Sequence, residues 1–499
     1  MAISMHIDGA RPGVTINKNI YGHFSEHLGR CIYGGIFVGK DSPIPNVNGM
    51  RTDVVEALKK LQIPTLRWPG GCFADEYHWR DGIGAQETRK RMVNTNWGGV
   101  VEDNSFGTHE FLELCRQLGC DPYINANVGS GTVREMAEWV EYLNSDGDSS
   151  VVRERWANGR KDAWGVKFWG VGNESWGCGG NMRPEFYADQ FRRFATYCRD
   201  YGENRLYRIA CGPSDADLNW TETLMRLAGR QMDALTLHSY TVPSGDWAVK
   251  GSATEFDEER YYKTLAGANR METLVTEHDA IISRVEQELA RQAPDHRVHR
   301  VDLIVDEWGC WHDVEPGTNP GFLYQQNTMR DAMVAALTLN IFNHHADRVV
   351  MANIAQTVNV LQSVILTEGD EMLLTPTYHV FDLYRRHMNA QLLDSALFCD
   401  TMPCGVKQIS ASASMKDGVV TVTAANLHAT QAAELNLTID GVALGEVSAR
   451  MICGDPHDKN TFEEKNKVQI QPLTAIEKIA GGVKVTLPAC SVAEIVIGG

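Results

Sequence analysis

The chain has 499 residues, which is enough for two or three domains, and its composition, 43% hydrophobic and 22% charged, is ordinary for a globular protein. Its formal net charge of −17 argues against nucleic acid or an anionic membrane as a partner, because both require a basic surface. Neutral substrates remain open.

Residues 1–13 carry neither the basic segment nor the apolar run of a signal peptide, and the chain has no run of about 18 apolar residues that could span a membrane. We therefore expect a cytoplasmic protein. The 12 cysteines are scattered and form no C-x-x-C pair, which argues against a zinc ribbon or a thioredoxin motif. In a reducing compartment, most of them should be free, buried thiols.

The N-terminal half and the middle of the chain alternate between two patterns. Residues 3–8 predict a strand whose partner we expect in the C-terminal part. Short apolar runs then predict strands over 19–24, 64–68, 122–126, 166–171, 206–211, 234–238, 302–305 and 348–352. Helical periodicity follows them over 51–61, 107–118, 132–144, 184–201, 216–228, 254–291, 322–342 and 378–388. Eight strands, each followed by a helix, favour a closed (β/α)8 barrel, and a large open α/β sheet is the alternative.

The pattern changes after about residue 390. Short alternating segments predict strands over 406–414, 419–424, 433–439, 468–471 and 493–497. Asp417-Gly418 is a hairpin signal between two of them. We expect a C-terminal antiparallel β-sandwich that includes the N-terminal strand. The predicted division is a barrel over 15–385 and a β-sandwich formed by 1–14 with 386–499.

Two of the predicted barrel strands end in a glutamate. Glu174 follows the strand over 166–171, and Glu307 follows the strand over 302–305. A buried carboxylate without a partner is costly, and the reacting groups of a (β/α)8 barrel lie at the carboxyl ends of its strands. The fourth and seventh strands lie nearly opposite in the ring, so we expect the two side chains to face each other. A structural ion pair with a barrel arginine is the alternative for either glutamate alone.

The other polar residues at the strand ends are mostly amides, carboxylates and aromatics. They are His23, Glu26, His27, Arg67, Trp68, Cys72, Asn125, Asn127, Asn173, His238, Tyr240, Trp311, Asn353 and Gln356. Such side chains satisfy sugar hydroxyls and cover the apolar faces of sugar rings. A pair of glutamates suits glycoside hydrolysis, in which one carboxyl group delivers a proton and the other is ionised.

Six stretches, spread over residues 20–378, carry a family resemblance. They are Ile20-Tyr21-Gly22-His23-Phe24-Ser25-Glu26-His27-Leu28-Gly29, Leu66-Arg67-Trp68-Pro69-Gly70-Gly71-Cys72-Phe73, Gly170-Val171-Gly172-Asn173-Glu174, Asp306-Glu307-Trp308-Gly309, Met351-Ala352-Asn353-Ile354-Ala355-Gln356 and Thr375-Pro376-Thr377-Tyr378. In these stretches and their order, the chain resembles the α-L-arabinofuranosidases of glycoside hydrolase family 51.

The resemblance implies a retaining, exo-acting enzyme with Glu174 as acid/base and Glu307 as nucleophile. It implies that Glu26, Asn173, Tyr240 and Gln356 hold the furanose ring and that Arg67 keeps the nucleophile ionised. It further implies terminal arabinofuranosyl units of arabinoxylan or arabinan fragments as substrate, no cofactor or metal, and a homo-oligomer, commonly a hexamer.

The resemblance also implies that Cys72 and Cys178 line the sugar pocket close together, either as a disulfide or as two unlinked side chains. Trp97 and Trp311 either bound the pocket or its leaving-group side, or belong to the core.

Three rival functions stay open. A glycosidase of the same clan that acts on a xyloside, a galactofuranoside or β-glucan would share both glutamates. A non-catalytic sugar-binding module would lack one of them. The stretch from His23 to His27 has the H-x-x-E-H spacing of a zinc peptidase, but that motif needs a helix, and the flanking Gly22 and Gly29 argue against one.

Overall fold

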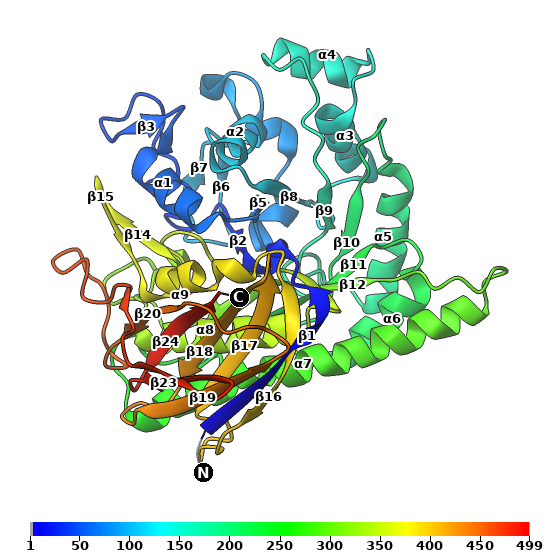
Figure 1. The fold of residues 1–499 in the computed structure, drawn as a ribbon. Helices are drawn as coiled ribbons and strands as arrows, with labels where there is room; N and C mark the ends of the chain where they lie inside the picture. The colour runs from blue at the N-terminus through cyan, green and yellow to red at the C-terminus, as the bar shows by residue number, and fades with distance from the viewer. Residues whose placement is uncertain (1–2, 499) are drawn as a thin grey trace.

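The computed structural model describes residues 3–498 and contains a closed barrel of eight parallel strands among them (Figure 1). In barrel order the strands are β2 (Gly22–Phe24), β5 (Thr65–Trp68), β8 (Asp121–Ala126), β9 (Phe168–Val171), β10 (Tyr207–Ala210), β11 (Ala234–Thr241), β12 (Asp302–Cys310) and β13 (Val349–Ile354). The last strand pairs with the first, through Asn353 with Gly22 and Ile354 with His23. The barrel prediction is therefore confirmed, and the open sheet is excluded.

Helices cover the outside of the barrel. They are α1 (Thr52–Leu61), α2 (Thr108–Leu118), α3 (Val133–Asn144), α4 (Ser150–Ala157), α5 (Pro184–Tyr197), α6 (Leu218–Ala228), α7 (Glu258–Arg291), α8 (Met329–His344) and α9 (Pro376–Tyr384). The sequence did not predict α4. It placed the start of α8 at residue 322, which is wrong. Thr328 caps the helix, since its hydroxyl accepts from the Arg330 amide and its own amide donates to Asp331, so 323–328 remain a loop.

Helix α8 lies between the two parts of the molecule. It contacts β12 of the barrel on one side and β17 (Ile409–Lys416), β18 (Val419–Asn426) and β24 (Ser491–Ile497) on the other. Its residues from Met329 to Asn343 are all buried. A helix that is apolar around most of its circumference is stable only when it is covered on all sides, and here the second domain supplies the cover.

The C-terminal part forms a ten-stranded sheet, counted over the described residues, around a hydrophobic core of its own. Its order is β21 (Gln471–Pro472), β20 (Val447–Cys453), β24, β18, β17, β16 (Gln391–Phe398), β1 (Ile3–Thr15), β19 (Ala433–Asp440), β23 (Gly482–Leu487) and β22 (Ile476–Ile479). This architecture is consistent with the expected β-sandwich. The sequence did not predict β16, β20, β22 and β23, and of the strand expected over 468–471 only the end is present, in β21.

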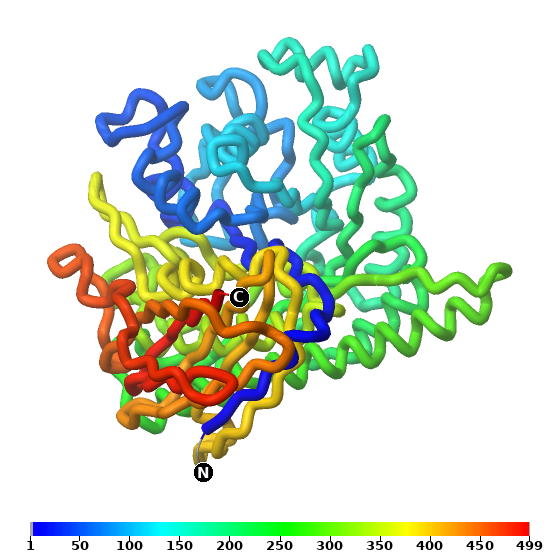
Figure 2. The backbone as a smooth tube through the Cα atoms, in the orientation of Figure 1, coloured from blue at the N-terminus to red at the C-terminus, as the bar shows by residue number. Residues whose placement is uncertain are grey.

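The N-terminal strand joins this domain, as predicted. β1 pairs antiparallel with β16 and parallel with β19, so the domain is not wholly antiparallel. Figure 2 shows the N-terminal segment running beside chain from the C-terminal part, and the first and last described strands, β1 and β24, belong to the same sheet.

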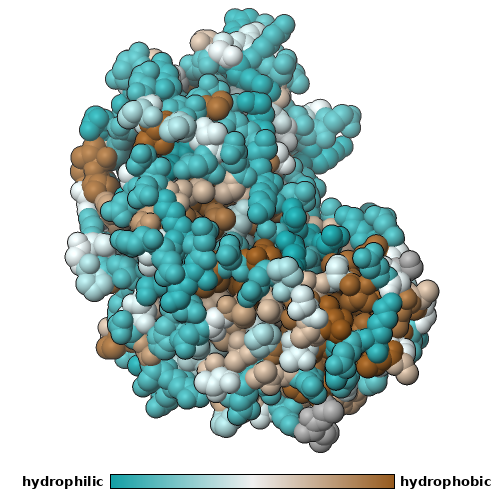
Figure 3. Space-filling view, turned by 60° about the vertical axis from the view of Figure 1, so that its left-hand side comes forward, coloured by the Kyte–Doolittle hydropathy of each residue, from teal (hydrophilic) through white to brown (hydrophobic). Residues whose placement is uncertain are grey.

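The outer surface is mainly hydrophilic in the view of Figure 3, and hydrophobic residues show there in separate groups at the left edge, in the centre and at the lower right. Within residues 3–498 no helix combines the length and the apolar character that a membrane crossing requires.

Candidate active site

Glu174 and Glu307 meet at the carboxyl ends of β9 and β12. One carboxylate oxygen of each, together with a ring nitrogen of His238, lies within 4.8 Å of the other two. Glu174 has a φ of 38°, in the left-handed region that residues other than glycine rarely adopt. Such strain persists only where the surrounding structure imposes it, and it is concentrated at functional sites.

Glu307 is held by two donors. Arg67 Nη1 lies 2.8 Å from Oε1, and the Tyr240 hydroxyl donates to Oε2 at 2.6 Å. The same guanidinium donates through Nη2 to Asn173 Oδ1 at 2.6 Å. The buried Arg67 side chain therefore fixes the position of Glu307 relative to Asn173, the residue that precedes Glu174.

His238 connects the two glutamates to a further carboxylate. Its Nε2 lies 3.0 Å from Asp306 Oδ1 and its Nδ1 lies 2.9 Å from Glu174 Oε1. Burial alone would lower the pKa of His238, but the charges of Glu307 and Asp306 raise it to about 10. The surrounding carboxylates thus favour the charged imidazolium form, whose Nδ1 donates to Glu174 and whose Nε2 forms an ion pair with Asp306.

Burial raises the pKa of Glu174 above its ordinary value, and the charge of Glu307 acts in the same direction, against the hydrogen bond from His238. Glu174 therefore keeps its proton to a higher pH than an exposed glutamate does. This is the property that a general acid needs.

Asp306 is a site residue that sequence reasoning missed, although it directly precedes Glu307. Besides its contact with His238, it lies 3.2 Å from Arg67 Nε and accepts from the Tyr123 hydroxyl at 2.8 Å. Despite burial, Arg67 and His238 hold the pKa of Asp306 below its usual value. Neighbouring residues of a regular strand point to opposite faces, but the register of β12 shifts next to this position against both of its neighbours. That irregularity lets Asp306 and Glu307 share Arg67.

Glu26 forms one wall of the site. Its Oε1 accepts from the Phe73 amide at 3.0 Å and from Trp97 Nε1 at 2.9 Å, and its Oε2 accepts from Gln356 Nε2 at 3.0 Å. Trp97 lies between β6 (Met92–Val93) and β7 (Val101–Glu102), which form a short hairpin. Burial and the charge of Glu307 raise the pKa of Glu26 to about 7.

Gly71 lies between the carboxylates. A β-carbon at this position would sit 3.1 Å from Glu307 Oε1 and 3.2 Å from Glu26 Oε1. A side chain would therefore occupy the space in which the two acids converge.

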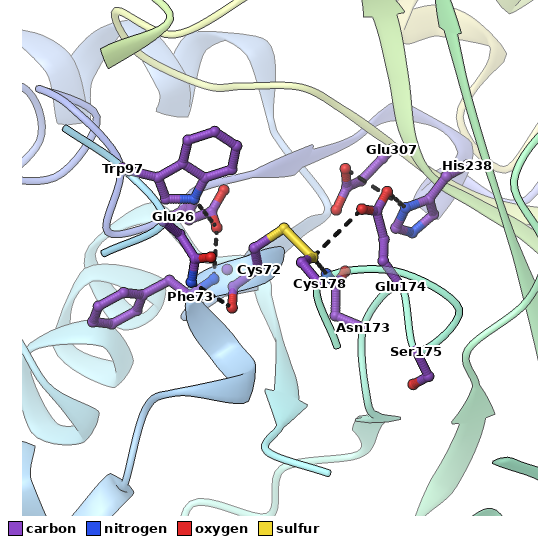
Figure 4. The surroundings of a disulfide bond; sticks show 12 residues. Glu26, Cys72, Phe73, Trp97, Asn173, Glu174, Ser175, Cys178, His238 and Glu307 are labelled. Atoms are coloured by element: carbon purple, nitrogen blue, oxygen red, sulfur yellow. Dashed lines mark hydrogen bonds and ion pairs between the residues drawn. A yellow bond between two sulfur atoms is a disulfide. The ribbon is translucent and has the colours of Figure 1, made fainter. Parts of the chain in front are cut away.

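Cys72 and Cys178 form a disulfide, which decides between the two arrangements left open by the sequence. Figure 4 shows the bond between Glu26 and Trp97 on one side and Glu174, His238 and Glu307 on the other. The Cys178 sulfur lies 3.6 Å from Glu174 Oε2. The disulfide links the short helix Cys72–Asp75 to the loop after β9 at the edge of the site.

These residues surround a small pocket of about 40 Å³. Its lining is Glu26, Leu28, Gly71, Cys72, Trp97, Glu174, Tyr240, Glu307, Trp311, Leu323, Gln356 and Leu361. Trp97 and Trp311 thus belong to the pocket and not to the core alone. Arg67 and Asn173 are almost fully buried and are not among the lining residues.

Trp247, in the loop after β11, is a second residue that sequence reasoning missed. Its ring packs edge-on against Trp311 at 5.3 Å between centroids and against Tyr240 at 6.5 Å, and the residue remains 50% exposed. The signal in the sequence that could have identified it was its place on a loop that follows a barrel strand.

The H-x-x-E-H stretch does not lie on a helix, as the sequence analysis expected, since His23 belongs to β2 and His27 to the loop after it. His23 packs on Phe381, with 4.8 Å between ring centroids, whereas His27 stacks on Phe73 at 4.7 Å. Among the described residues, no group of potential metal-ligating side chains contains either histidine.

Comparisons with known proteins agree with this geometry. The model of the α-L-arabinofuranosidase 1 domain matches residues 57–261, and that of the α-L-arabinofuranosidase C-terminal domain matches residues 306–491. An intracellular exo-α-L-arabinofuranosidase of Bacteroides ovatus is 50% identical over 99% of this chain and 95% of its own length. The chain belongs to the α-L-arabinofuranosidases of glycoside hydrolase family 51.

Solved structures of this arabinofuranosidase family have the same fold. The family 51 arabinofuranosidase of Xanthomonas axonopodis pv. citri superposes with a TM-score of 0.95 at 44% identity, with 99% of each chain covered. An arabinose complex of the α-L-arabinofuranosidase of Thermotoga maritima gives 0.85 at 29% identity, again with 99% of each chain covered. Membership in the family argues against the peptidase and the sugar-binding module.

Proposed function

We propose that this α-L-arabinofuranosidase removes terminal non-reducing arabinofuranosyl units from arabinoxylan- or arabinan-derived oligosaccharides by double displacement. Glu307 is the nucleophile and Glu174 the acid/base. The observation that carries this mechanism is the approach of the two glutamates, whose nearest oxygens lie within 4.8 Å. Retaining glycosidases need carboxyl groups about 5–5.5 Å apart, whereas inverting ones need about 6.5–9.5 Å to admit a water molecule.

In the first step, Glu307 attacks the anomeric carbon, the bond to the leaving oxygen breaks, and Glu174 gives its proton to that oxygen. The product is a covalent arabinosyl-enzyme. In the second step, Glu174, now a carboxylate, takes a proton from water, and the water oxygen displaces Glu307 at the anomeric carbon. Arabinose is released and the proton returns to Glu174.

The pocket supports recognition of a single terminal sugar unit. Glu26, Tyr240 and Gln356 line it and offer hydrogen-bonding groups for the ring hydroxyls, and Asn173, held by Arg67 behind the lining, is the fourth residue that we assign to the furanose ring. The Bacteroides ovatus relative is named as an exo-acting enzyme. On the leaving-group side, Trp311 and Trp247 offer aromatic faces for the next sugar.

The test is hydrolysis of 4-nitrophenyl α-L-arabinofuranoside, with the anomer of the first-formed product followed by NMR. We expect turnover with net retention. Turnover of a xyloside, a galactofuranoside or β-glucan instead would agree with the roles of the two glutamates but would contradict arabinofuranose as the substrate sugar. Net inversion would contradict Glu307 as a nucleophile.

The pH profile is expected to depend on His238. Glu174 must be protonated to act as an acid. An ordinary glutamate has a pKa of about 4.3, so the raised pKa of Glu174 places the basic limb of the kcat/KM profile at a higher pH than that. The imidazolium lowers the pKa of Glu174, so His238→Gln should raise that pKa and move the basic limb to higher pH. Profiles of kcat/KM against pH, with His344→Gln as a control outside the site, test this. A limb that moves to lower pH would contradict it.

We also propose that the enzyme is a homo-oligomer, a hexamer, and that it acts in the cytoplasm on imported oligosaccharides. The name of the Bacteroides ovatus relative includes the word intracellular, which supports the location. Light scattering on the purified protein tests the assembly.

The domain division that we propose is a barrel domain over 15–385 and a β-domain formed by 1–14 with 386–499.

A further inference from the structure

A loop of the C-terminal domain contacts the barrel segment that carries Trp247. His457, four residues after β20 ends, stacks its ring on Phe256, with centroids 4.1 Å apart and planes inclined by 14°. His457 Nε2 also donates to the Phe256 carbonyl at 2.8 Å. Phe256 belongs to the segment 242–257, which connects β11 to α7 and carries Trp247.

The barrel supplies the other half of the contact. The Arg330 guanidinium carbon lies 3.8 Å from the centroid of the Phe256 ring, and Nη2 donates to the carbonyls of Ser252 and Ala253 at 3.2 and 3.1 Å. Arg330 is fully buried. A guanidinium over an aromatic face and a ring stacked on that aromatic both favour one fixed position of the ring.

The same C-terminal loop also holds the first turn of α8. The Met329 amide donates to the Asp458 carbonyl at 2.9 Å, and the Arg330 amide donates to the Pro456 carbonyl at 3.1 Å. These amides belong to the first helical turn, which has no intrahelical partners for its N–H groups. The segment 455–458 therefore carries His457 and also fixes the start of the helix from which Arg330 extends. We call His457, Phe256 and Arg330 the loop clamp.

The clamped segment continues directly to the pocket. Gly251 exchanges hydrogen bonds with Asp313, since its amide donates to Oδ2 and its carbonyl accepts from the Asp313 amide, both at 2.9 Å. Four residues earlier, Trp247 packs on Trp311, as described above. Because Trp247 is half exposed, burial alone does not determine its position.

Attachment of the two domains does not require the loop clamp. Hydrogen bonds between Asn340 and Ser410 and between Asn343 and Ser412 already join α8 to the sheet. The short helix Arg385–His387, which follows α9, is joined to it by the bonds of His387 with Ser414 and Thr423. The loop clamp lies at the opposite, N-terminal end of α8, beside the mouth of the barrel.

We propose that the C-terminal domain positions Trp247 for the leaving-group sugar through the loop clamp, with His457 and Phe256 as positioning residues. This inference rests on the proposed function, in which Trp247 faces the sugar next to the scissile bond. It assigns the C-terminal domain a role in substrate affinity that does not involve contact with the reacting atoms.

The test compares two substrates in three variants of the full-length protein. In His457→Ala, we expect KM for an arabinoxylan-derived oligosaccharide to rise about fivefold, the change that the loss of one well-placed aromatic contact produces. For 4-nitrophenyl α-L-arabinofuranoside, kcat should stay within about twofold, because the reacting groups are untouched. His457→Phe keeps the stacked ring and should restore most of the affinity. His344→Ala removes a different bond between the domains, to the Ala411 carbonyl at the far end of α8, and should change neither parameter.

Amide hydrogen exchange tests the loop clamp independently of the enzymatic activity. Exchange over residues 244–256 should be faster in His457→Ala than in the wild type and in His344→Ala, at an unchanged melting temperature. Unchanged exchange would overturn the loop clamp, and faster exchange without the rise in KM would overturn its role in substrate affinity. If wild-type protein turns over no arabinofuranoside, the proposed function fails, and the exchange experiment still decides whether His457 holds the segment.

Discussion

Replacing Glu307 with glutamine is expected to lower kcat/KM for 4-nitrophenyl α-L-arabinofuranoside by a factor on the order of 10⁵, which corresponds to about 7 kcal/mol of transition-state stabilisation. The amide keeps the shape of the side chain, but it is too poor a nucleophile to form the arabinosyl-enzyme. Arg67 and Tyr240, which hold the Glu307 carboxylate, both remain in place. Initial rates and the melting temperature are the two measurements.

Glu368→Gln is the matched control, since Glu368 is an exposed glutamate of the β14 hairpin strand (Ile365–Glu368). It should retain wild-type activity. Substantial activity in Glu307→Gln, with the fold intact, would mean that another group attacks the sugar and that the assignment of the nucleophile is wrong.

Replacing Glu174 with alanine is expected to have a different signature. General acid/base catalysis contributes about 10²–10⁴ in rate, so kcat/KM for an oligosaccharide should fall within that range. With 4-nitrophenol as leaving group the first step needs little protonation, so the arabinosyl-enzyme still forms and then persists, because no base activates water. Azide needs no base and fits the space left by the carboxylate. Added azide should therefore restore turnover and yield arabinofuranosyl azide of retained configuration.

The rescue distinguishes the two glutamates from each other. In Glu307→Gln, azide should not restore the same product, because no arabinosyl-enzyme forms. Loss of activity in Glu174→Ala that is equal for both leaving groups and insensitive to azide would contradict the acid/base assignment and leave a structural role for Glu174.

The barrel was predictable because each of its parts is encoded locally. Buried parallel strands are short apolar runs, and the helices between them have one apolar stripe, so the alternation is visible in the sequence without knowledge of any contact. The start of α8 was predicted wrongly because the apolar and aromatic residues 322–324 lie upstream of it, and the polar residues 325–328 between them and the helix include no glycine or proline that would mark a break. The helix begins at Met329 because Thr328 and Asp331 cap it there.

The β-domain was harder to predict than the barrel. Strands such as β20 and β22 lie near the ends of the sheet, where burial is partial, and their alternation is correspondingly weak. The pairing of β1 with β16 and β19 joins segments nearly 400 residues or more apart, as in Ile7 with Ser395 and Asp8 with Asp440. The sequence indicated a partner in the C-terminal part for the first strand, but it did not indicate which strands these were.

For the site, position along a strand was sufficient to identify Glu174 and Glu307, because the (β/α)8 barrel brings all strand ends to one face. The same criterion placed Glu26, Arg67, Asn173, Tyr240 and Gln356 at strand ends, and the resemblance to family 51 added their expected roles. Asp306 escaped because regular alternation would turn it away from its neighbour, and the register shift that reverses this appears only in the paired strands.

By itself, the sequence determined the class of fold, the strand ends at which chemistry can occur, and the family. Periodicity, strand-end position and short motifs are properties of neighbouring residues. The tertiary structure alone decided the charge of His238, the raised pKa of Glu174, the bond between Cys72 and Cys178, and the loop clamp. Each depends on groups distant in the chain, 64 residues apart for His238 and Glu174 and 106 for the two cysteines. Burial and electrostatic coupling arise only when folding brings such groups together.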